Sequence, residues 1–464
     1  MFTLPAGTLP DKDNVADLIA YNELKRPRYN SLENYYLGIH EILNRAKPET
    51  LANNKVVTNH CRYITDVNVG YLLGNPVEYQ ADDDLNIDLI LDEYKKQTID
   101  NLNHEIARDV SIFGRQYELE YLSGNDVKSK DIDVRNCAIA YDDTVEHNKL
   151  FAVIYEPHAK QKNKFEDIMV FDANYIYDFT NSTGAIELQD KGTKTHDFQK
   201  VPVIEYINNP EKLGDFEHVL TLVDAYNTLT SDRVNDKEQW VDAILCLYGI
   251  DLDDDMMQGI QNDRILSNLP EGTKAEYVTK AFNEADADTL RRVIEADIHK
   301  ISMTPNMSDE NFVGNSSGVA IRYKLLAFEQ SVSNKERYFE KGLMERFELY
   351  NNYLSKLKSM PIVPIYKVDA IFKRNLPQND LETSQMIANL TSQVDKETLV
   401  GQLSFIKNAK ETIAAKAKED QAAADVQAEQ FGTNVDAAGN QIGTATDQKQ
   451  VSNLDKLNKL LTNG

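Results

Sequence analysis

Apolar positions near the start of the chain recur first with a helical period. Tyr63, Val67 and Tyr71 are spaced as on one face of a helix. Asn59 stands where a capping residue is expected, and Gly74 stands where the helix would end. The pattern therefore predicts one amphipathic helix between Asn59 and Gly74.

A second helix and a series of strands follow. Residues 101–114 have helical periodicity and end in a glycine. Residues 115–126 then alternate Tyr and Leu with Glu, as in a half-buried strand. Four later stretches, separated by Asp, Asn and Gly, also look like strands: NCAIAYDD, LFAVIYEP, DIMVFDANYIYDF and AIELQD. Helices packed on an antiparallel sheet are expected, which is the α+β fold class.

Longer helices are predicted after residue 210. Apolar residues at helical spacing in residues 215–240 predict a rod of roughly 40 Å. Two short strand-like stretches, AILCLYGI and AEYVTKAF, flank an acidic helix-like run between residues 241 and 283. The helix predicted for residues 284–303 pairs Arg291 with Glu295 at i,i+4. Its apolar stripe consists of Leu290, Ile294, Ile298 and Ile301.

A polar, glycine-rich loop at residues 304–318 precedes a very long helix. Residues 319–357 would span nearly ~60 Å if the helix were straight, with Ser333, Asn334 and Gly342 as candidate bend points. Its aromatic residues are expected mainly in the core, with a surface for contact between subunits as the alternative. These residues are Phe328, Phe339, Phe347, Tyr350 and Tyr353.

The C-terminal part contains a strand, helices and a polar tail. The stretch PIVPIYKVDAIFKRNLPQND predicts a strand that rejoins the first sheet and leaves through a proline. Residues 380–418 predict two or three helices rich in Ala, Lys, Glu and Gln. Residues 421–464 have a composition typical of disorder, although VSNLDKLNKLL could form a short helix on a partner.

The charge balance changes which partners are expected. The chain has 50 basic and 75 acidic residues and a net charge of -25. A protein that held DNA by neutralising phosphates would need a basic face, so this chain as a whole should repel DNA. Solubility alone would explain the acidity equally well. No stretch is apolar and long enough for a membrane span, and the first residues lack the pattern of a signal peptide.

Catalytic and metal-binding motifs are absent from the sequence. Cys61, Cys137 and Cys246 are far apart, so buried thiols are expected rather than disulfides or a metal site. No histidine pair has the spacing of a metal site, and neither a G-x-S-x-G elbow nor a P-loop occurs. We therefore expect no cofactor, no metal and no catalytic residue.

One acidic run could suggest calcium binding. Aspartates alternate in residues 251–255, but the sixth and twelfth places of an EF-hand loop are Met256 and Asn262. The match fails, and a solvated acidic surface is the expected interpretation. A metal-dependent nuclease or hydrolase that uses this run, or Asp142 and Asp143, is the alternative function.

Five segments, taken in order, resemble one protein family. They are NNKVVTNHCRYITDVNVGYLLGNPVEY, EIARDVSIFGRQYELEYL, AIAYDDT, VPVIEYINNPEKLGDFEHVLTLVDAYN and DENFVGNSSGVAIRYKLLAFE. Together they cover about residues 30 to 350 and resemble the portal proteins of tailed bacteriophages. The likeness is to the subgroup typical of long non-contractile-tailed phages of Gram-positive hosts.

The resemblance implies a portal fold assembled as a ring of about twelve subunits. A wing of helices and sheet would form the outer part, two stem helices would surround a channel, a small α/β clip would project between them, and a helical crown would follow. The implied parts are the wing (1–214 and 319–378), stem helices (215–240 and 284–303), clip (241–283), tunnel loop (304–318), crown (379–420) and tail (421–464).

The tunnel loop would face DNA in such a channel. A duplex of about 20 Å width would be held by lysine or arginine through counterion release, whereas small polar and acidic side chains avoid this. Glycines let the loop shift as DNA passes. The expected loop residues are Asn306, Ser308, Asp309, Glu310, Asn311, Phe312, Gly314, Asn315, Ser316, Ser317 and Gly318.

The resemblance also implies partners and a location. The clip would meet the terminase large subunit and later the head-tail connector or adaptor, with Asp251, Asp253, Asp254 and Asp255 as its candidate contact residues. Other implied partners are further copies of the chain, the major capsid protein and the scaffolding protein. Double-stranded DNA would pass without tight binding. The ring would sit at one vertex of the virion capsid after assembly in the host cytoplasm, and it would have no enzymatic activity.

Overall fold

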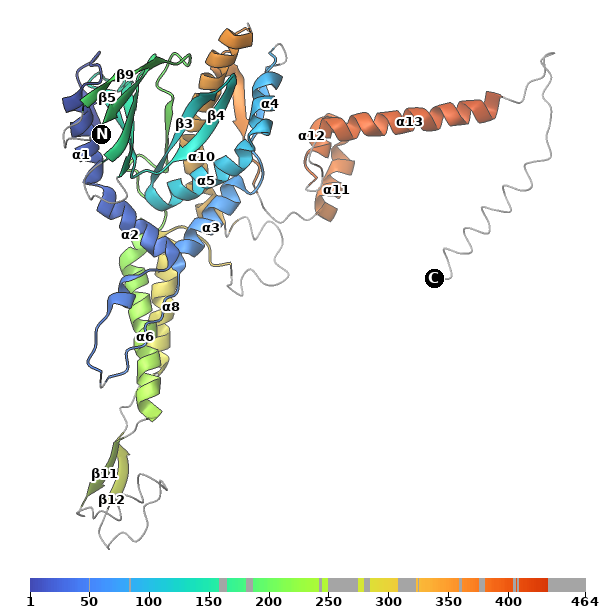
Figure 1. Cartoon of the computed structure of the whole chain (residues 1–464). Coiled ribbons are helices and arrows are strands. Elements are labelled where there is room, and N and C mark those ends of the chain that lie inside the picture. The colour runs from blue at the N-terminus through green and yellow to red at the C-terminus, as the bar shows by residue number, and fades with distance from the viewer. Residues whose placement is uncertain are drawn as a thin grey trace, which may run out of the picture. The chain divides into compact units, whose positions relative to one another are not determined.

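The computed structural model describes most of residues 1–432 (Figure 1). Its description leaves out residues 50, 83–84, 158–164, 181–186, 242–243, 249–273, 279–283, 308–322, 324, 359–360, 375–379, 404–405, 407–408 and 433–464. The chain divides into two compact units, Met1–Leu376 and Pro377–Gly464. Helices and sheets both occur, as the α+β prediction requires.

The largest sheet has six strands in the order β1-β5-β6-β7-β8-β9. They are β1 (Phe2–Leu4), β5 (Cys137–Asp142), β6 (Lys149–Pro157), β7 (Phe165–Phe171), β8 (Tyr175–Thr180) and β9 (Glu187–Thr195). Pairs are antiparallel as predicted, except that β1 runs parallel to β5, with Phe2 opposite Ala140. Sequence analysis missed β1 because three residues carry no usable period. The helix α1 (Lys12–Glu23) buries Val15 and Leu18 in the core cluster of this sheet.

A second sheet places β3 (Arg115–Ser123) between β10 (Val203–Ile207) and β4 (Asp126–Ile132). The helix α5 (Ile99–Phe113) leads directly into β3 through Gly114. Gly114 has φ 81°, and a Cβ there would lie 2.2 Å from the carbonyl oxygen of Lys212. Glycine is therefore required at this turn for both its conformation and the close approach of the backbone.

Further helices of the first unit pack around these sheets. They are α2 (Arg26–Leu37), α3 (His60–Leu73) and α4 (Asp88–Lys96). The predicted cap of α3 is confirmed, because Asn59 accepts a hydrogen bond from the Arg62 amide at 3.0 Å. Cys61 and Cys137 are buried free thiols, as expected. None of the described helices is long and apolar enough to cross a membrane.

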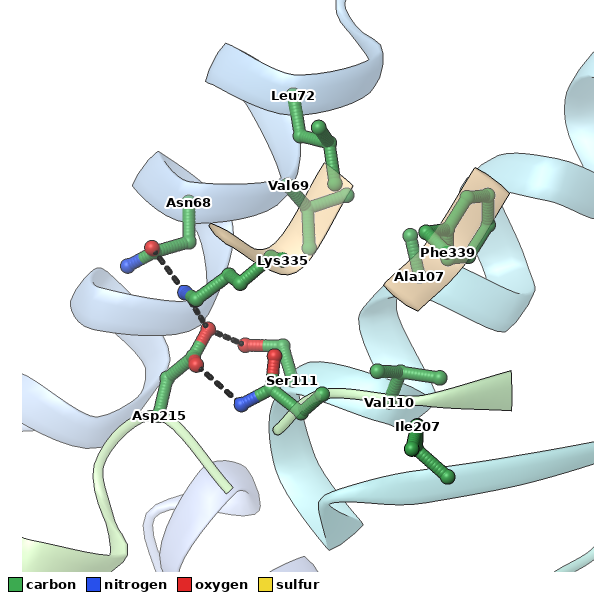
Figure 2. A pocket seen from close by; sticks show the side chains of 11 residues that line it. Asn68, Val69, Leu72, Ala107, Val110, Ser111, Ile207, Asp215, Lys335 and Phe339 are labelled. Carbon is green, nitrogen blue, oxygen red and sulfur yellow. Dashed lines mark hydrogen bonds and ion pairs between the residues drawn. The ribbon is translucent and has the colours of Figure 1, made fainter. Parts of the chain in front are cut away.

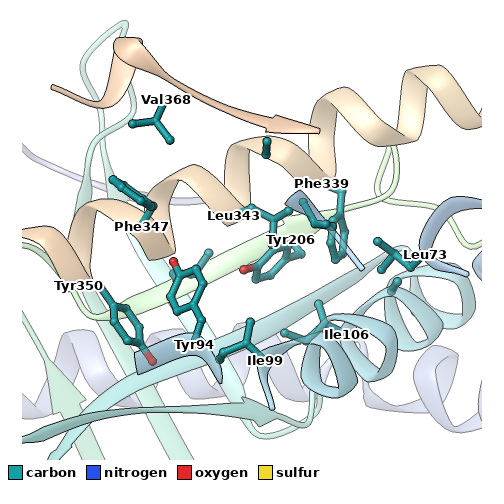
Figure 3. Close-up of a cluster of buried hydrophobic side chains, with 14 of the residues drawn as sticks. Leu73, Tyr94, Ile99, Ile106, Tyr206, Phe339, Leu343, Phe347, Tyr350 and Val368 are labelled. Atoms are coloured by element: carbon teal, nitrogen blue, oxygen red, sulfur yellow. The ribbon is translucent and has the colours of Figure 1, made fainter. Parts of the chain in front are cut away.

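The long helix α10 (Leu326–Lys358) runs through the main core of the first unit (Figure 3). Phe339, Leu343 and Phe347 lie on its buried face and are at most 2% exposed. Phe328, Tyr350 and Tyr353 of α10 also belong to this core, as expected. Gly342 allows close packing, since a Cβ there would lie 2.3 Å from the Tyr206 ring.

One strand prediction was wrong in its partner. The strand β13 (Val368–Ile371) pairs with β2 (Glu78–Ala81) in a separate two-stranded sheet and does not rejoin a larger sheet. Sequence periodicity identifies a strand but not the strand that pairs with it.

Two helices flank a hairpin in the remaining part of the first unit. A short 3-10 turn, η2 (Glu217–Val219), precedes α6 (Leu220–Val241), and α8 (Glu284–Ile301) follows β11 (Ile244–Tyr248) and β12 (Lys274–Val278). The two strands pair antiparallel, from Ile244 opposite Val278 to Tyr248 opposite Lys274. The predicted order of helix, two strands and helix is confirmed.

The second unit contains α11 (Asp380–Leu390), α12 (Lys396–Val400) and α13 (Ala409–Gly432). Asp395 caps α12 by accepting the amide of Thr398 at 2.8 Å. The helices expected after residue 380 are confirmed, and α13 extends beyond residue 420.

A buried charge cluster joins α10 to the second sheet. Arg346, Glu118 and Glu120 are each 0% exposed. The Arg346 guanidinium donates hydrogen bonds to the Glu118 carboxylate at 2.9 Å and to the side-chain oxygen Oδ1 of Asn103 at 2.6 Å. Its Nε atom is 3.9 Å from Glu120. Burial, together with the charge of Glu118, raises the pKa of Glu120 well above its usual value.

We expect Arg346→Met to lower the free energy of unfolding by about 3–5 kcal/mol, because buried Glu118 would lose the guanidinium group that pairs with it. Lys356→Met is the control, since its ion pair with Asp197 is exposed and should contribute at most ~1 kcal/mol. Urea denaturation measures both. Equal losses in the two variants would contradict the central role of Arg346.

We expect the Glu120→Gln variant to gain stability relative to the wild-type chain as the pH rises. In the unfolded chain Glu120 releases its proton near pH ~4.3, whereas the raised pKa keeps it protonated in the folded chain. The unfolded state then binds fewer protons, so the wild-type chain loses stability relative to the variant by about 1.4 kcal/mol per pH unit between the two pKa values. Urea denaturation at several pH values measures the difference in free energy of unfolding between the two chains. If the pKa of Glu120 were normal, this difference would stay constant above pH ~5.

Candidate functional site

The antiparallel helices α6 and α8 lie side by side and are joined along their length (Figure 1). Val223, Tyr226 and Ile298 are buried in one core cluster. Polar contacts follow: Arg291 donates to the Tyr226 hydroxyl at 3.1 Å, and Arg233 lies 3.4 Å from Asp288. The predicted pair of Arg291 and Glu295 forms at 2.8 Å. The two helices therefore form one packed helical hairpin rather than two independent helices.

A polar stripe on α6 binds an extended segment of the chain. Asn227, Ser231 and Asn235 are buried and spaced four residues apart. Their side-chain oxygens accept the backbone amides of Thr58 at 2.8 Å, Val56 at 2.9 Å and Asn54 at 2.7 Å. Residues 54–58 are thus held to α6, because side-chain oxygens of the helix accept the backbone amides that a neighbouring strand would otherwise bind.

The end of the helix pair docks on α3 through aromatic rings. His60 contacts the ring of Tyr226 edge-on, with centroids 4.8 Å apart, and the ring of His299 at 5.8 Å. Burial, reinforced by His299, lowers the pKa of His60 to about 4. The His60 imidazole is therefore neutral at pH ~7 and packs as an aromatic group.

The base of the predicted loop is anchored by one hydroxyl group. The Tyr63 hydroxyl donates to the carbonyl oxygen of Pro305 at 3.0 Å and accepts the amide of Met307 at 2.8 Å. The side-chain amide of Asn306 donates to Glu295 at 3.2 Å. The chain therefore leaves α8 in a fixed direction before the segment that the structure does not describe.

An ion pair connects α10 to the start of the helix pair (Figure 2). Lys335 lies 2.7 Å from Asp215, which also accepts the hydroxyl of Ser111 at 2.7 Å. Lys335 further donates to Asn68, whose amide group donates to Thr304 at 2.9 Å. This cluster ties α3, α5 and α10 to both Asp215, which precedes α6, and Thr304, which follows α8.

Two cavities border this ion pair: one of about 800 Å³ is lined by Asp215, Lys335 and Met303, among others, whereas the one drawn in Figure 2 has a volume of only about 20 Å³. Pockets for organic ligands are typically ten or more times larger. The smaller cavity is therefore not a binding pocket for a small molecule, and the cluster around it holds structural elements together.

Most sequence-predicted site residues lie outside the described residues. Of the loop residues, Asn306 is described, and those from Ser308 to Gly318 are not. The acidic residues of the run 251–255 also lie outside the described part of the chain.

The aspartates of the alternative hydrolase site have structural partners. Asp142 accepts hydrogen bonds from the Thr144 hydroxyl at 2.6 Å and the Asn148 amide at 2.9 Å, which lower its pKa. Asp143 accepts the amide of Ala6 at 3.1 Å. Among the described residues, no group of three or more His, Cys, Asp or Glu side chains could hold a metal ion. Asp142 therefore shapes a turn.

Sequence analysis missed the residues that hold the junction. Tyr63 was assigned only to an apolar stripe, and Asp215 and Lys335 were not singled out. One signal was available: Asn227, Ser231 and Asn235 repeat at four-residue spacing along one face of the predicted helix, which indicates a polar partner along that face. The partners themselves are more than a hundred residues away in the sequence.

Sequence comparisons with known proteins point to one family. A family model described as "Phage portal protein, SPP1 Gp6-like" matches residues 16–426. The portal protein of Bacillus phage SPP1 is 21% identical over 397 residues, which cover 79% of this chain and 76% of that protein. The portal protein of Clostridium phage phiCD119 is 19% identical over 406 residues, which cover 81% of this chain and 88% of that protein. Because the family model spans most of its length, the chain belongs to the family of SPP1 Gp6-like phage portal proteins.

Proposed function

We propose that the protein forms a homo-oligomeric ring at one capsid vertex and that double-stranded DNA enters and leaves the capsid through its centre. The supporting observation is the helix pair α6 and α8, which is braced on a large α+β body and leads at one end into the loop after Thr304. Membership of the portal family supplies the context for this geometry. Portal proteins are structural components of the virion, so the energy for packaging comes from a separate ATP-hydrolysing terminase.

The elements support an assignment of the portal parts. The wing comprises residues 1–214 and 319–378, and the stem helices are residues 215–240 and 284–303. The clip is residues 241–283, and its hairpin of β11 and β12 is consistent with a small separate module. The crown is residues 379–420, within the compact unit that starts at Pro377.

The tunnel loop, residues 304–318, contacts the DNA without holding it. Asn306 is tied to Glu295 and Met307 to Tyr63, so the base of the loop is fixed to the wing and stem. The rest of the loop contains no lysine or arginine. Phosphates consequently find no cation with which to exchange their counterions.

The clip docks the terminase large subunit and later the head-tail connector. Asp251, Asp253, Asp254 and Asp255 give this module an acidic surface, which suits basic surfaces on those partners. The capsid and scaffolding proteins contact the ring during assembly in the host cytoplasm.

Electron microscopy of the purified protein is expected to show closed rings of about twelve subunits, because a head-to-tail contact with constant rotation closes on itself. Particle mass measured in solution should match the count in the images. A chain that stays monomeric at every protein and salt concentration would contradict the proposal.

The double substitution Asn311→Lys and Asn315→Lys should leave rings intact and reduce the yield of packaged DNA, because lysines in the channel would bind phosphates. Packaging into capsids measures the effect. The control is Asn101→Lys with Asn125→Lys, which adds the same charge at exposed positions of α5 and the β3–β4 turn. Equal packaging by both variants would show that residues 311 and 315 do not meet DNA.

A further inference from the structure

Four basic side chains gather where the start of α2 meets the second sheet. Lys25 stands at the N-cap of α2, and Arg28 follows it by about one turn of the helix. Arg115 is the first residue of β3, and Lys212 lies in the turn after β10. The helix and the turn are in contact, because Arg28 donates to the carbonyl oxygen of Lys212 at 3.1 Å. These four residues form the cation cluster.

Within the described residues, two carboxylates pair with the cation cluster. Glu205 accepts a hydrogen bond from Lys212 at 2.6 Å and lies 3.2 Å from Arg115. Glu217 lies 2.6 Å from Arg28. Four cations therefore share two carboxylates, and the cluster keeps an excess of positive charge.

Lys25 is the cation that no carboxylate neutralises. It makes no ion pair with a described residue, and its ammonium group lies over the ring of Tyr21, 3.8 Å from the centroid. Burial, together with the charges of Arg115 and Lys212, lowers the pKa of Lys25 to about 7. A negative charge beside Lys25 would remove this repulsion.

Two buried polar atoms at the cluster have no hydrogen-bond partner among the described residues. They are the Tyr29 hydroxyl and Nε of Arg115. Tyr29 is 0% exposed and follows Lys25 by four residues on α2, so the two side chains lie on the same side of the helix. Burial raises the pKa of Tyr29, and the charge of Arg115 opposes that rise, which indicates that the guanidinium group is near the hydroxyl. Both atoms are hydrogen-bond donors, and buried donors normally have an acceptor.

We propose that the cation cluster binds a small oxyanion of the phosphate class, whose oxygen atoms accept hydrogen bonds from Lys25, Arg115 and the Tyr29 hydroxyl. The first turn of α2 contains no acidic residue, and its N-cap side chain makes no capping hydrogen bond. The positive end of the helix dipole therefore also favours an anion there.

A free ion is the fitting occupant because the cation cluster is largely enclosed. The side chains of Arg115 and Lys212 are only 16% and 19% exposed. The backbone of a nucleic acid or an acidic protein surface is too large to reach them. The bound ion would connect α2 to β3 and to the turn at Lys212, and the inference does not depend on the proposed ring.

Titration calorimetry of the full chain with sodium phosphate, in chloride buffer of constant ionic strength, tests the site. We expect one ion per chain. Lys25→Met should weaken binding at least about tenfold, because a charged hydrogen bond is lost, and Tyr29→Phe by about 2–10-fold. The matched control is Lys341→Met, because Lys341 also lies over a tyrosine ring, that of Tyr338, but is exposed on α10. The control should bind phosphate as the wild-type chain does.

Thermal unfolding provides a second measurement with an opposite sign. Without phosphate, Lys25→Met should be at least as stable as the wild-type chain, because the substitution removes an unpaired cation beside two others. Phosphate should raise the melting temperature of the wild-type chain by about 2 °C and that of the variant by less. A lower melting temperature of Lys25→Met in phosphate-free buffer would contradict the excess of charge on which the site rests.

The remaining outcomes also decide the inference. Equal phosphate affinity in the wild-type chain and all three variants would show an adventitious ion only, and no binding by the wild-type chain would overturn the site. Displacement of phosphate by a short DNA duplex would show that the cluster is open to a nucleic acid backbone, which contradicts a free ion. Closed rings seen by electron microscopy alongside any of these results would leave the proposed function intact.

Discussion

The contact of Arg346 with Glu118 is the interaction on which the rest of the first unit depends. It fixes α10 to the central strand β3 at 0% exposure, and Asn103 brings α5 into the same cluster. A guanidinium group without its carboxylate would be very costly at this depth. The cluster therefore permits few other positions for α10, because a shift along its axis would separate the charges.

Apolar packing around this cluster supplies most of the stabilisation. Phe339, Leu343 and Phe347 line the same face of α10, and Tyr206 from β10 lies against Gly342. The hydroxyl of Tyr206 donates to Glu118 at 2.7 Å, so the aromatic core and the charge cluster are one structure. Packing contributes stability in proportion to the apolar area buried, whereas the buried ions contribute mainly to specificity.

The same helix positions the candidate functional site. Lys335, three turns before Arg346 on α10, binds Asp215 at the start of the helix pair. Through Asn68 it is also connected to Thr304, where the loop begins. The direction in which α6 and α8 leave the body is thus set by polar contacts that converge on one lysine. A ring of identical subunits needs such a rigid base, because each subunit must hold its helix pair in the same direction.

Sequence periodicity was sufficient to find most of the elements. Capping Asn59 and the turn at Gly114 are local features, and each was confirmed. The half-buried strand expected at β3 was wrong, because Glu118 and Glu120 are buried as deeply as Tyr117 whereas Tyr121 is 39% exposed. The helix α8 was confirmed, but Leu290 and Ile301 of its predicted apolar stripe are about half exposed. Family membership could also be inferred from the order of segments, since the resemblance extends over much of the chain. The pairing of β13 with β2 and the parallel strand β1 could not be inferred, because strand pairing depends on contacts between distant residues.

Some features of the candidate site could likewise be inferred from the sequence, whereas others required the tertiary structure. The sequence alone determined that residues 304–318 are mostly small and polar, apart from Met307, Phe312 and Val313, and that the chain carries a net charge of -25. Only the tertiary structure decided that Tyr63 anchors the loop and that Lys335 meets Asp215, since these residues are brought together by packing of α3, α8 and α10. Local sequence governs backbone conformation through short-range sterics and hydrogen bonding, whereas burial selects which distant polar groups become partners.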